Sequence, residues 1–480
     1  MNTNKGNESD NQKTVKTAFL NTFANGVSLV IGMIMVPVIS RVFLPEELGI
    51  ATTFLSTRNV SVIIVTLAIY SYVNRAMIDL KNRDEKKDYI FTITLFSIFM
   101  TAIFFFLLFP FRNQLKEMLS LDSFLYYWLF ASILGFALYS IADYYCIFHN
   151  KSKTVFAIVL CSGPVSQFLS VGLAYVFPTK KYWGRVLGLD AAYMIISVLL
   201  LVWLLFSGKR RFCLNQLRRT ISFTIPIIPH LLSQMVLTQC DLIMISSLTS
   251  SDKSGLYSMG HTIGFLALTV MSQVMASWSP WVYRKIKEKN ETMVYANAKL
   301  IFLLGAYLSI GLLTISTELV HLFLAPSYSP CIYIIPPLVL SMFFQFCYIF
   351  LYDLEYYYKK PNWIAVSSIV AAVLNFILNF IFIPAYGYLA AGYTTMASYF
   401  TLLLCSYFFV RKLNVSRIYP LGYFVKMGLL VIGYTLFSMC FLDSIQIRYG
   451  VFLCTSGAFL WMHRKMIAEK WKQVLRWRKK

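Results

Sequence analysis

The sequence predicts an all-α polytopic membrane protein with about 14 transmembrane helices. Of the 480 residues, 58% are hydrophobic and only 13% are charged, about half the charged fraction usual in soluble domains. The mean hydropathy is +0.64. A soluble fold of this size cannot bury so much apolar surface. Membrane helices of about 20 apolar residues each account for it. A soluble enzyme, a secreted scaffold and a DNA-binding protein are therefore excluded.

Apolar stretches of the length of a membrane helix recur along the whole chain. We expect the spans at residues 15–39, 50–73, 89–110, 122–147, 154–177, 186–206, 221–248, 255–281, 295–321, 331–354, 362–384, 388–410, 421–442 and 447–463. The first stretch is too long for a signal-peptide core and lacks an A-x-A cleavage site, so it is predicted to remain as the first helix.

The Lys and Arg residues alternate between the two sides of these spans. Of the 43, 32 fall in the tails and loops of one side and 8 in the loops of the other, and Arg58, Lys299 and Lys426 fall within spans. Because cytoplasmic loops retain Lys and Arg, both termini are predicted to be cytoplasmic. The net charge of +22 then reflects membrane orientation, and nucleic acid is not an expected partner.

The loops divide the chain into five predicted parts. Residues 1–16 are expected to form a cytoplasmic tail and residues 17–207 a six-helix N-lobe. A basic cytoplasmic linker (208–220) leads to a six-helix C-lobe (221–410), and residues 411–480 add two helices and a basic cytoplasmic tail.

A short repeat relates the two lobes. Ile39-Ser40 is followed after eight residues by Gly49-Ile50, and the same pattern returns as Ile245-Ser246 and Gly255-Leu256, at an offset of 206 in both cases. Each copy joins the end of one predicted helix to the start of the next. Six helices separate the copies, so they share one orientation, as in transporters built from parallel repeats.

The sequence lacks the motifs of catalysis and of cofactor binding. There is no G-x4-G-K-[ST] loop, HExxH or GxSxG motif, and the nine cysteines are scattered without a CxxC pair. No catalytic residue, metal or cofactor is therefore predicted, and the chain is not expected to be an enzyme. A membrane polymerase or ligase needs a large outer loop, and the longest predicted outer loop has only about ten residues.

Arg58 is the most notable charge within a predicted span. It lies about eight residues into the second helix, roughly 12 Å from the outer boundary at 1.5 Å per residue. An Arg at this depth is costly unless it faces protein or water, and its planar guanidinium suits phosphate. We predict an anion-binding role for Arg58, with snorkelling to the headgroups as the alternative.

Asp241 is the corresponding acid in the second half of the chain. It lies about seven residues from the outer end of the seventh helix. Three roles remain open for it: a pair with Arg58, a site for a coupling proton or cation, or a structural ion pair. His230 and His261 titrate near neutral pH when unperturbed and are further candidates for ion coupling, although a structural role is the more common one.

Asn375 and Asn379 lie four residues apart and hence on one face of their helix. They are candidates to bind a sugar or, more commonly, a neighbouring helix. Asp143, Asp353 and Glu355 lie close to cytoplasmic helix ends, where contact with headgroups accounts for them.

Three stretches of the sequence resemble one family of transporters. They are Pro37 to Ile50 with Asn74-Arg75, Ile221-Ser-Phe-Thr-Ile-Pro226 through Asp241 to Trp281-Val-Tyr-Arg284, and Asn375-x3-Asn379-x4-Pro384-x2-Gly387-x2-Ala390-Ala391-Gly392. They are similar to the bacterial polysaccharide (O-antigen/Wzx-type) flippases of the MOP exporter superfamily, which also contains the MATE transporters. In many relatives a basic residue follows the acid, whereas Asp241 is followed by Leu242.

The resemblance implies two six-helix lobes around a cavity that opens alternately to each side of the bacterial cytoplasmic (inner) membrane. The implied substrate is an oligosaccharide on undecaprenyl pyrophosphate, which is moved to the outer leaflet for O-antigen or capsule synthesis. Arg58 and Arg75 are the positions expected to hold the pyrophosphate. Membrane lipids are expected partners, and a polysaccharide polymerase is a further one. The alternative function is that of a MATE-like, cation-coupled exporter of small molecules, which requires an acidic cavity.

Overall fold

The computed structural model describes residues 2–208, 210–413, 418–419 and 421–457. Within these ranges every regular element is a helix, and no strand occurs. Up to residue 208 the elements are α1 (Asn2–Val42), α2 (Pro45–Val65), η1 (Ile69–Tyr72), α3 (Val73–Asp79), α4 (Arg83–Leu108), η2 (Phe109–Phe111), α5 (Arg112–Met118), α6 (Ser123–Phe148), α7 (Ser152–Leu160), η3 (Cys161–Val165), α8 (Ser166–Val176) and α9 (Lys181–Phe206). They are followed by α10 (Leu214–Thr224), η4 (Ile225–Ile227), α11 (Ile228–Met235), η5 (Val236–Cys240), α12 (Asp241–Leu248), α13 (Ser251–Gly264), α14 (Leu266–Lys287), α15 (Glu291–Phe323), η6 (Pro326–Ile334), α16 (Ile335–Tyr357), α17 (Pro361–Tyr386), α18 (Tyr388–Arg411) and α19 (Leu421–Cys440).

The helices confirm the predicted class of an all-α polytopic membrane protein. Twelve helical segments are long and apolar enough to cross a membrane, and a thirteenth is formed by α13 and α14 together, which are bent by 43° where they meet. These segments match the first thirteen predicted spans. The predicted fourteenth span, 447–463, is helical up to residue 457 and otherwise lies outside the described residues. The count of 14 is therefore not confirmed.

The helix ends differ from those predicted. The polar residues 2–16, expected as a tail, are helical and continuous with the first span. The second span begins at Pro45 instead of residue 50 because Pro45 and the acidic Glu46 and Glu47 favour a helix start, and Glu47 Oε2 accepts the Leu44 N–H at 2.9 Å. Arg58 consequently lies thirteen residues into α2, about 20 Å along the helix.

The chain forms two compact units. Unit 1 contains Met1–Met259, Phe323–Cys331 and Pro361–Leu402, and unit 2 contains Gly260–Leu322, Ile332–Lys360 and Leu403–Lys480. Helices α11, α12 and α17, which belong to the predicted C-lobe, are part of the same compact unit as the helices of the predicted N-lobe. The units are thus a different partition of the chain from the two predicted lobes, which remain a prediction about the parts that move.

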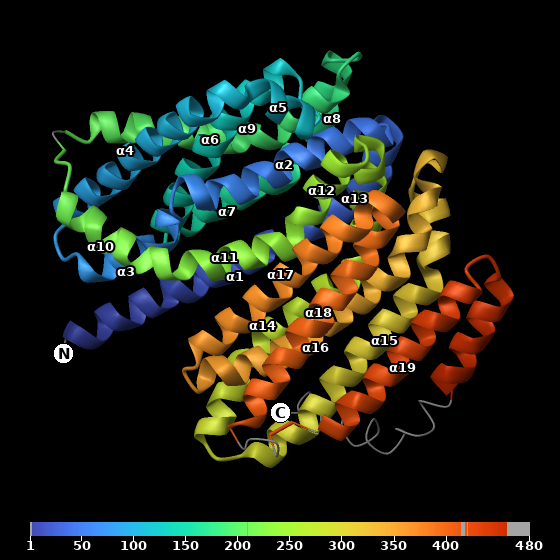
Figure 1. Cartoon of the computed structure of the whole chain (residues 1–480). Helices are drawn as coiled ribbons and strands as arrows, with labels where there is room; N and C mark the ends of the chain where they lie inside the picture. Colours follow the sequence, from blue (N-terminus) through green and yellow to red (C-terminus); the bar gives the residue numbers. More distant parts are fainter. Residues whose placement is uncertain (1, 209, 414–417, 420, 458–480) are drawn as a thin grey trace. The chain divides into compact units, whose positions relative to one another are not determined.

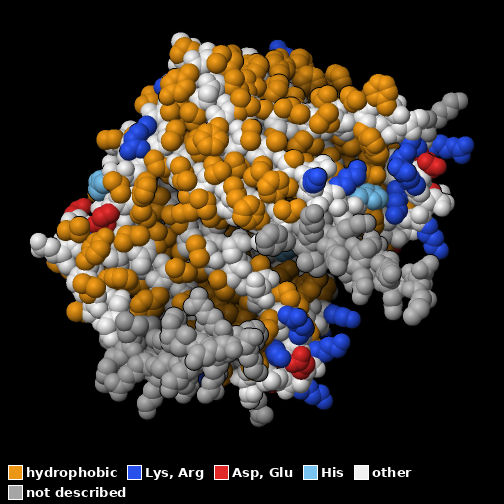
Figure 2. All heavy atoms as spheres, turned by 180° about the vertical axis from the view of Figure 1, so that it is seen from behind, with side chains coloured by type: hydrophobic (Ala, Val, Ile, Leu, Met, Phe, Trp, Pro, Cys, Tyr) orange, Lys and Arg blue, Asp and Glu red, His pale blue; other side chains and the backbone are white. Residues whose placement is uncertain are grey.

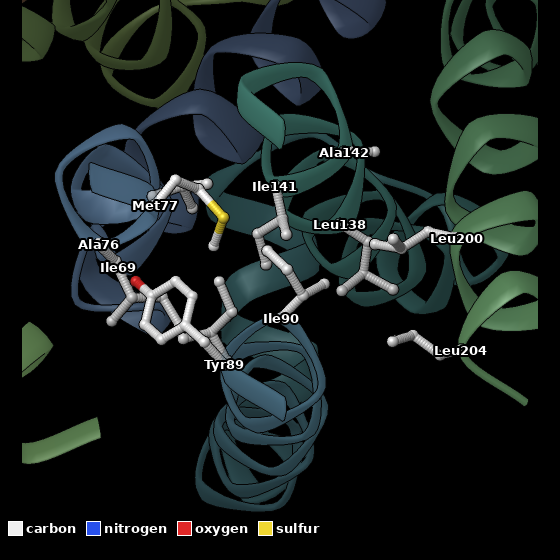
Figure 3. Close-up of a cluster of buried hydrophobic side chains, with 12 residues drawn as sticks. Ile69, Ala76, Met77, Tyr89, Ile90, Leu138, Ile141, Ala142, Leu200 and Leu204 are labelled. Atoms are coloured by element: carbon white, nitrogen blue, oxygen red, sulfur yellow. The ribbon is translucent and has the colours of Figure 1, made fainter. Parts of the chain in front are cut away.

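Unit 1 is centred on helices that bury apolar side chains from distant parts of the chain. One cluster brings together side chains of η1, α3, α4, α6 and α9 (Figure 3). Its members are Ile69, Val73, Ala76, Met77, Tyr89, Ile90, Ile93, Leu138, Ile141, Ala142, Leu200 and Leu204. Many large hydrophobic side chains are also exposed, and Figure 2 shows hydrophobic side chains spread over much of the visible face of the molecule. Such a surface suits contact with lipid.

Two glycines allow α8 and α9 to pack closely. A Cβ atom on Gly184 would lie 2.4 Å from the backbone nitrogen of Ala174, and one on Gly188 would lie 2.3 Å from Cα of Ser170. The pair has the small-xxx-small spacing that brings membrane helices into backbone contact. The α8–α9 contact therefore depends on the absence of side chains at these positions.

We expect Gly188→Ala to destabilise the protein by about 1–3 kcal/mol, since the added methyl group meets backbone atoms that cannot move aside. The measurement is the thermal unfolding midpoint of the purified protein in detergent. Gly172→Ala on α8 is the matched control, because a Cβ atom there meets nothing within 4 Å. Equal midpoints for the two variants would contradict this packing.

Candidate functional site

Arg58 is buried among three helices of unit 1. Helices α2, α6 and α9 pack against one another (Figure 1). The Arg58 side chain on α2 is 6% exposed, and its Nη1 donates to Oδ1 of Asp190 on α9, whose side chain is 0% exposed. The second carboxylate oxygen, Oδ2, accepts the indole N–H of Trp128 on α6 at 3.0 Å. One ion pair thus ties the three helices together.

The rest of the Arg58 guanidinium is also covered. Its Nη2 and Nε donate to Oδ1 of Asn59 at 3.0 and 3.3 Å. The rings of Phe136 and Tyr193 lie 5.0 and 5.1 Å from Cζ, within the range of a cation–π contact. Arg58 therefore does not snorkel to the surface here. An anionic ligand would have to compete with Asp190 for the guanidinium.

Asp241 lies elsewhere in unit 1 and is not paired with Arg58. It is buried at the start of α12, where its Oδ2 accepts Tyr257 Oη–H and Thr395 Oγ1–H, both at 2.5 Å. Its Oδ1 accepts the side-chain amide of Asn379 at 2.6 Å. No Lys or Arg of the described residues forms an ion pair with it. The carboxyl group is therefore held by neutral donors alone.

The structure brings Asn375 and Asn379 to the same place as Asp241. Asn379 Nδ2 also donates to Asn375 Oδ1 at 3.2 Å, and Thr394 donates to Asn379 Oδ1. The amide nitrogen of Asn375 is buried without a hydrogen-bond partner. The inter-helix hydrogen bond that was one of the two sequence alternatives is therefore observed. Contact of these amides with a sugar remains a prediction.

The helix that carries Asp241 is irregular along its length. The 3₁₀ turn η4 contains Pro226, and the π-helical turn η5 (Val236–Cys240) directly precedes Asp241. A π-helical turn breaks the regular hydrogen-bond pattern and is frequent at functional sites. A further π-helical turn, η3, contains Pro164 but lies in the fifth span. The seventh span therefore has two built-in points at which its direction can change.

The two copies of the sequence repeat contact each other reciprocally in unit 1. A Cβ atom on Gly49 would lie 1.7 Å from the carbonyl oxygen of Ser251, and one on Gly255 would lie 1.9 Å from that of Pro45. Each contact is the other shifted by 206 residues. The hydroxyls of Thr53 and Ser254 are 3.4 Å apart beside them. We call this contact of the starts of α2 and α13 the outer seam, because the loops before both helices are predicted to lie outside.

The other predicted site residues lie apart from these clusters. Arg75 on α3 is mostly exposed and pairs with Asp79 one turn away, Nε to Oδ2 at 3.3 Å. His230 is half-buried, with Nδ1 3.0 Å from the hydroxyl of Ser368. His261, in unit 2, lies against the ring of Phe265 with centroids 4.5 Å apart. Their predicted roles stay untested by this geometry.

Several important residues were missed from the sequence. Asp190 is a charge within an apolar span, as Arg58 is. It was overlooked because its span was expected to begin at residue 186, which places Asp190 close to the helix end, whereas α9 begins at Lys181. Tyr257 and Thr395 gave no signal beyond ordinary polarity. Asp353 and Glu355 were assigned to headgroup contacts, which is wrong, because both are buried in unit 2. In the described ranges, no three His, Cys, Asp or Glu side chains form a group that fits a metal.

Residues 38–333, more than half of the chain, match the model of a family described as "Polysaccharide biosynthesis protein". The chain belongs to this family. The fold of the chain is similar to that of two solved structures. The "Lipid II flippase MurJ, inward closed conformation" is 15% identical, with a TM-score of 0.70, and the likeness covers 94% of this chain and 100% of that one. An inward-facing "multidrug resistance MATE family transporter of the MOP superfamily" is 9% identical with a TM-score of 0.59, covering 81% and 95%. Among curated proteins, a comparison by sequence finds no match.

For this polysaccharide biosynthesis family member, we expect Arg58→Gln and Asp190→Asn each to destabilise by about 3–5 kcal/mol, because each leaves a buried charge unpaired. The double variant should cost less than the sum of the two. The measurement is a double-mutant cycle on unfolding in detergent. The exposed Arg75–Asp79 pair is the control cycle, with an expected coupling below about 1 kcal/mol. Additive effects at Arg58 and Asp190 would show that the ion pair does not hold α2 to α9.

Proposed function

We propose that the chain is a flippase that moves undecaprenyl-pyrophosphate-linked oligosaccharide units across the bacterial cytoplasmic membrane by alternating access, for O-antigen or capsule synthesis, with both termini in the cytoplasm. The observation that carries the proposal is the match of residues 38–333 to the polysaccharide biosynthesis family in a chain built of membrane helices. The fold likeness to a lipid II flippase supports a lipid-linked substrate. A polysaccharide polymerase is the partner that such a product would require.

In this proposal Arg58 binds the pyrophosphate by exchange of partners. The guanidinium is paired with Asp190 in this structure, and a diphosphate offers more negative charge and more acceptor oxygens than one carboxylate. Trp128 continues to donate to Asp190 when Arg58 turns away, which lowers the cost of the unpaired carboxylate. Arg75, exposed on α3, is a first contact for the incoming head group.

Asp241 is the proposed ion-coupling group. A carboxyl group that is buried among neutral donors binds a proton or a cation at little structural cost, since no resident Lys or Arg has to be displaced. The π-helical turn before Asp241 gives a route by which a change of its charge alters the direction of the seventh span. His230 and His261 are the secondary candidates.

The outer seam is the proposed closure on the outer side. Its contacts are short backbone contacts between glycine-bearing helix starts, with a single side-chain hydroxyl pair. Separation of these helix starts breaks that hydroxyl contact and no ion pair of the described residues. Separation there, with closure on the cytoplasmic side, would release the substrate head outward.

The flippase proposal is tested with purified protein in vesicles that contain a fluorescent undecaprenyl-pyrophosphate oligosaccharide, with quenching of the outer leaflet as the readout. We expect transfer between leaflets at least tenfold above empty vesicles. Arg58→Ala and Arg58→Glu should abolish it, and Asp241→Asn should remove its response to an imposed ion gradient. In cells that lack the native copy, both Arg58 variants should fail to export glycan.

Normal glycan export by both Arg58 variants would refute the pyrophosphate role. Transfer of a fluorescent phospholipid at the same rate would show a nonspecific scramblase. The second candidate function, a MATE-like cation-coupled exporter, is favoured by the buried Asp241 and by the fold likeness. Drug sensitivity of a deletion strain, restored by the wild-type gene while glycan export stays normal, would favour that function instead.

For the seam, we expect Thr53→Cys with Ser254→Cys to form a disulfide under oxidation, because the two hydroxyls are 3.4 Å apart. The crosslink should block transport, and a reductant should restore it. Each single variant is the control for the nine native cysteines. Unchanged transport by the crosslinked protein would show that the seam stays closed throughout the cycle.

A further inference from the structure

The last turns of α16 in unit 2 carry two buried acids that the function proposed above does not use. Asp353 and Glu355 lie two residues apart, directly before the loop with Lys359 and Lys360 that is predicted to be cytoplasmic. Asp353 is 2% exposed and Glu355 is 0% exposed. A carboxylate with so little access to water requires an opposite charge or several hydrogen-bond donors.

Glu355 has one donor. Its Oε1 accepts the hydroxyl of Ser406, on the part of α18 that belongs to unit 2, at 2.8 Å. Its Oε2 is buried and has no hydrogen-bond partner. Asp353 is better satisfied, since Ser279 Oγ donates to Oδ2 at 2.8 Å and Tyr283 Oη donates to Oδ1 at 3.0 Å, both from α14. The two acids therefore differ, and Glu355 is the one that lacks partners for a negative charge.

No cation compensates for these acids within the described residues of unit 2. The titratable groups that face them are tyrosines, which are neutral near pH 7. They are Tyr348 and Tyr352 on α16, Tyr283 on α14 and Tyr419 before α19. On the neighbouring α15, Lys299 lies over the rings of Tyr295 and Tyr423, and Lys426 on α19 is exposed. The buried Arg448 is paired with Glu318.

Protonation resolves this arrangement. An ionised Glu355 would be an unpaired buried charge, which is costly, whereas the neutral acid carries no such cost. Because Oε1 accepts from Ser406, it acts as the carbonyl oxygen, and Oε2 is the atom that carries the proton. A proton requires no cavity, which agrees with the full burial of the side chain.

We infer that Glu355, positioned by Ser406, is a proton-binding site of unit 2, separate from Asp241 in unit 1. The ligand is a proton, and its position beside the Lys359-Lys360 loop assigns its exchange to the cytoplasmic side. Asp353 keeps its own hydrogen bonds with Ser279 and Tyr283 and is not assigned this proton. The use of this proton in transport rests on the proposed function, whereas its binding does not.

The binding is tested on the purified full-length protein by infrared spectroscopy, which detects the C=O stretch of a protonated carboxyl group. At about pH 7 we expect such a band in the wild type, shifted by exchange into heavy water and lost in Glu355→Gln. The band should persist in the matched control Glu288→Gln, since Glu288 is an exposed acid of the same unit. Should Glu355→Gln fail to fold, Glu355→Asp keeps the acid and should move the band. A wild type without the band, or a band unchanged in the Glu355 variants, would overturn the inference.

A second measurement separates the site from the transport proposal. In the vesicle assay, Glu355→Gln should weaken the dependence of the initial rate on an imposed pH gradient, with Asp241 left intact, and Ser406→Ala should change the pH at which the rate is half-maximal. A wild type that keeps its infrared band but moves no lipid-linked sugar would leave the proton site standing and refute the proposed function. If the transport rates of the wild type and of Glu355→Gln depend equally on the pH gradient, this proton is not used in transport.

Discussion

The cost of an ionised side chain away from water governs the arrangement of unit 1, and the ion pair of Arg58 and Asp190 is where that cost is met most completely. The two charges come from α2 and α9, and the pair is completed by Trp128 from α6. Each charge is costly when it is buried without an opposite charge. The relative rotation of these helices is therefore fixed by one contact more strictly than by the apolar packing around it, which many side-chain combinations satisfy.

Three buried acids illustrate three ways to satisfy the same constraint. Asp190 has a guanidinium, Asp241 has three neutral donors, and Glu355 has a single hydroxyl. In this order, Asp190 is a fixed negative charge, and Glu355 is the acid that is most stable in its neutral form. An acid of the first kind holds structure together, whereas acids of the second and third kinds are able to change their charge without the loss of a partner cation. For this reason the geometry distinguishes structural from exchangeable groups where residue type alone does not.

Thirteen of the membrane spans could be predicted from the sequence because hydropathy is a local and cumulative property, whereas the orientation inferred from Lys and Arg stays a prediction. The 206-residue repeat was also visible, and Gly49 and Gly255 proved to be contact points between its copies. The ion pair could not be predicted, since nothing in the sequence around Asp190 indicates that it contacts Arg58, 132 positions away. Other predictions were wrong because they relied on the distance of a residue from a helix end. Glu355 was judged by its distance from the end of its span, whereas its exposure depends on what packs around that end.

The reciprocal contact at the outer seam has a consequence for the architecture as a whole. Gly49 approaches Ser251, and their counterparts 206 positions away, Gly255 and Pro45, approach each other in the same way. The contact is therefore self-complementary, as the interface of an isologous dimer is. One chain thus contains, by covalent linkage, the interface that two identical half-length chains would form about a twofold axis. A substitution in one copy of the repeat therefore changes the surface against which the other copy packs. The two halves are consequently free to diverge in what they carry, as Arg58 and Asp241 do, but much less free to diverge where they meet.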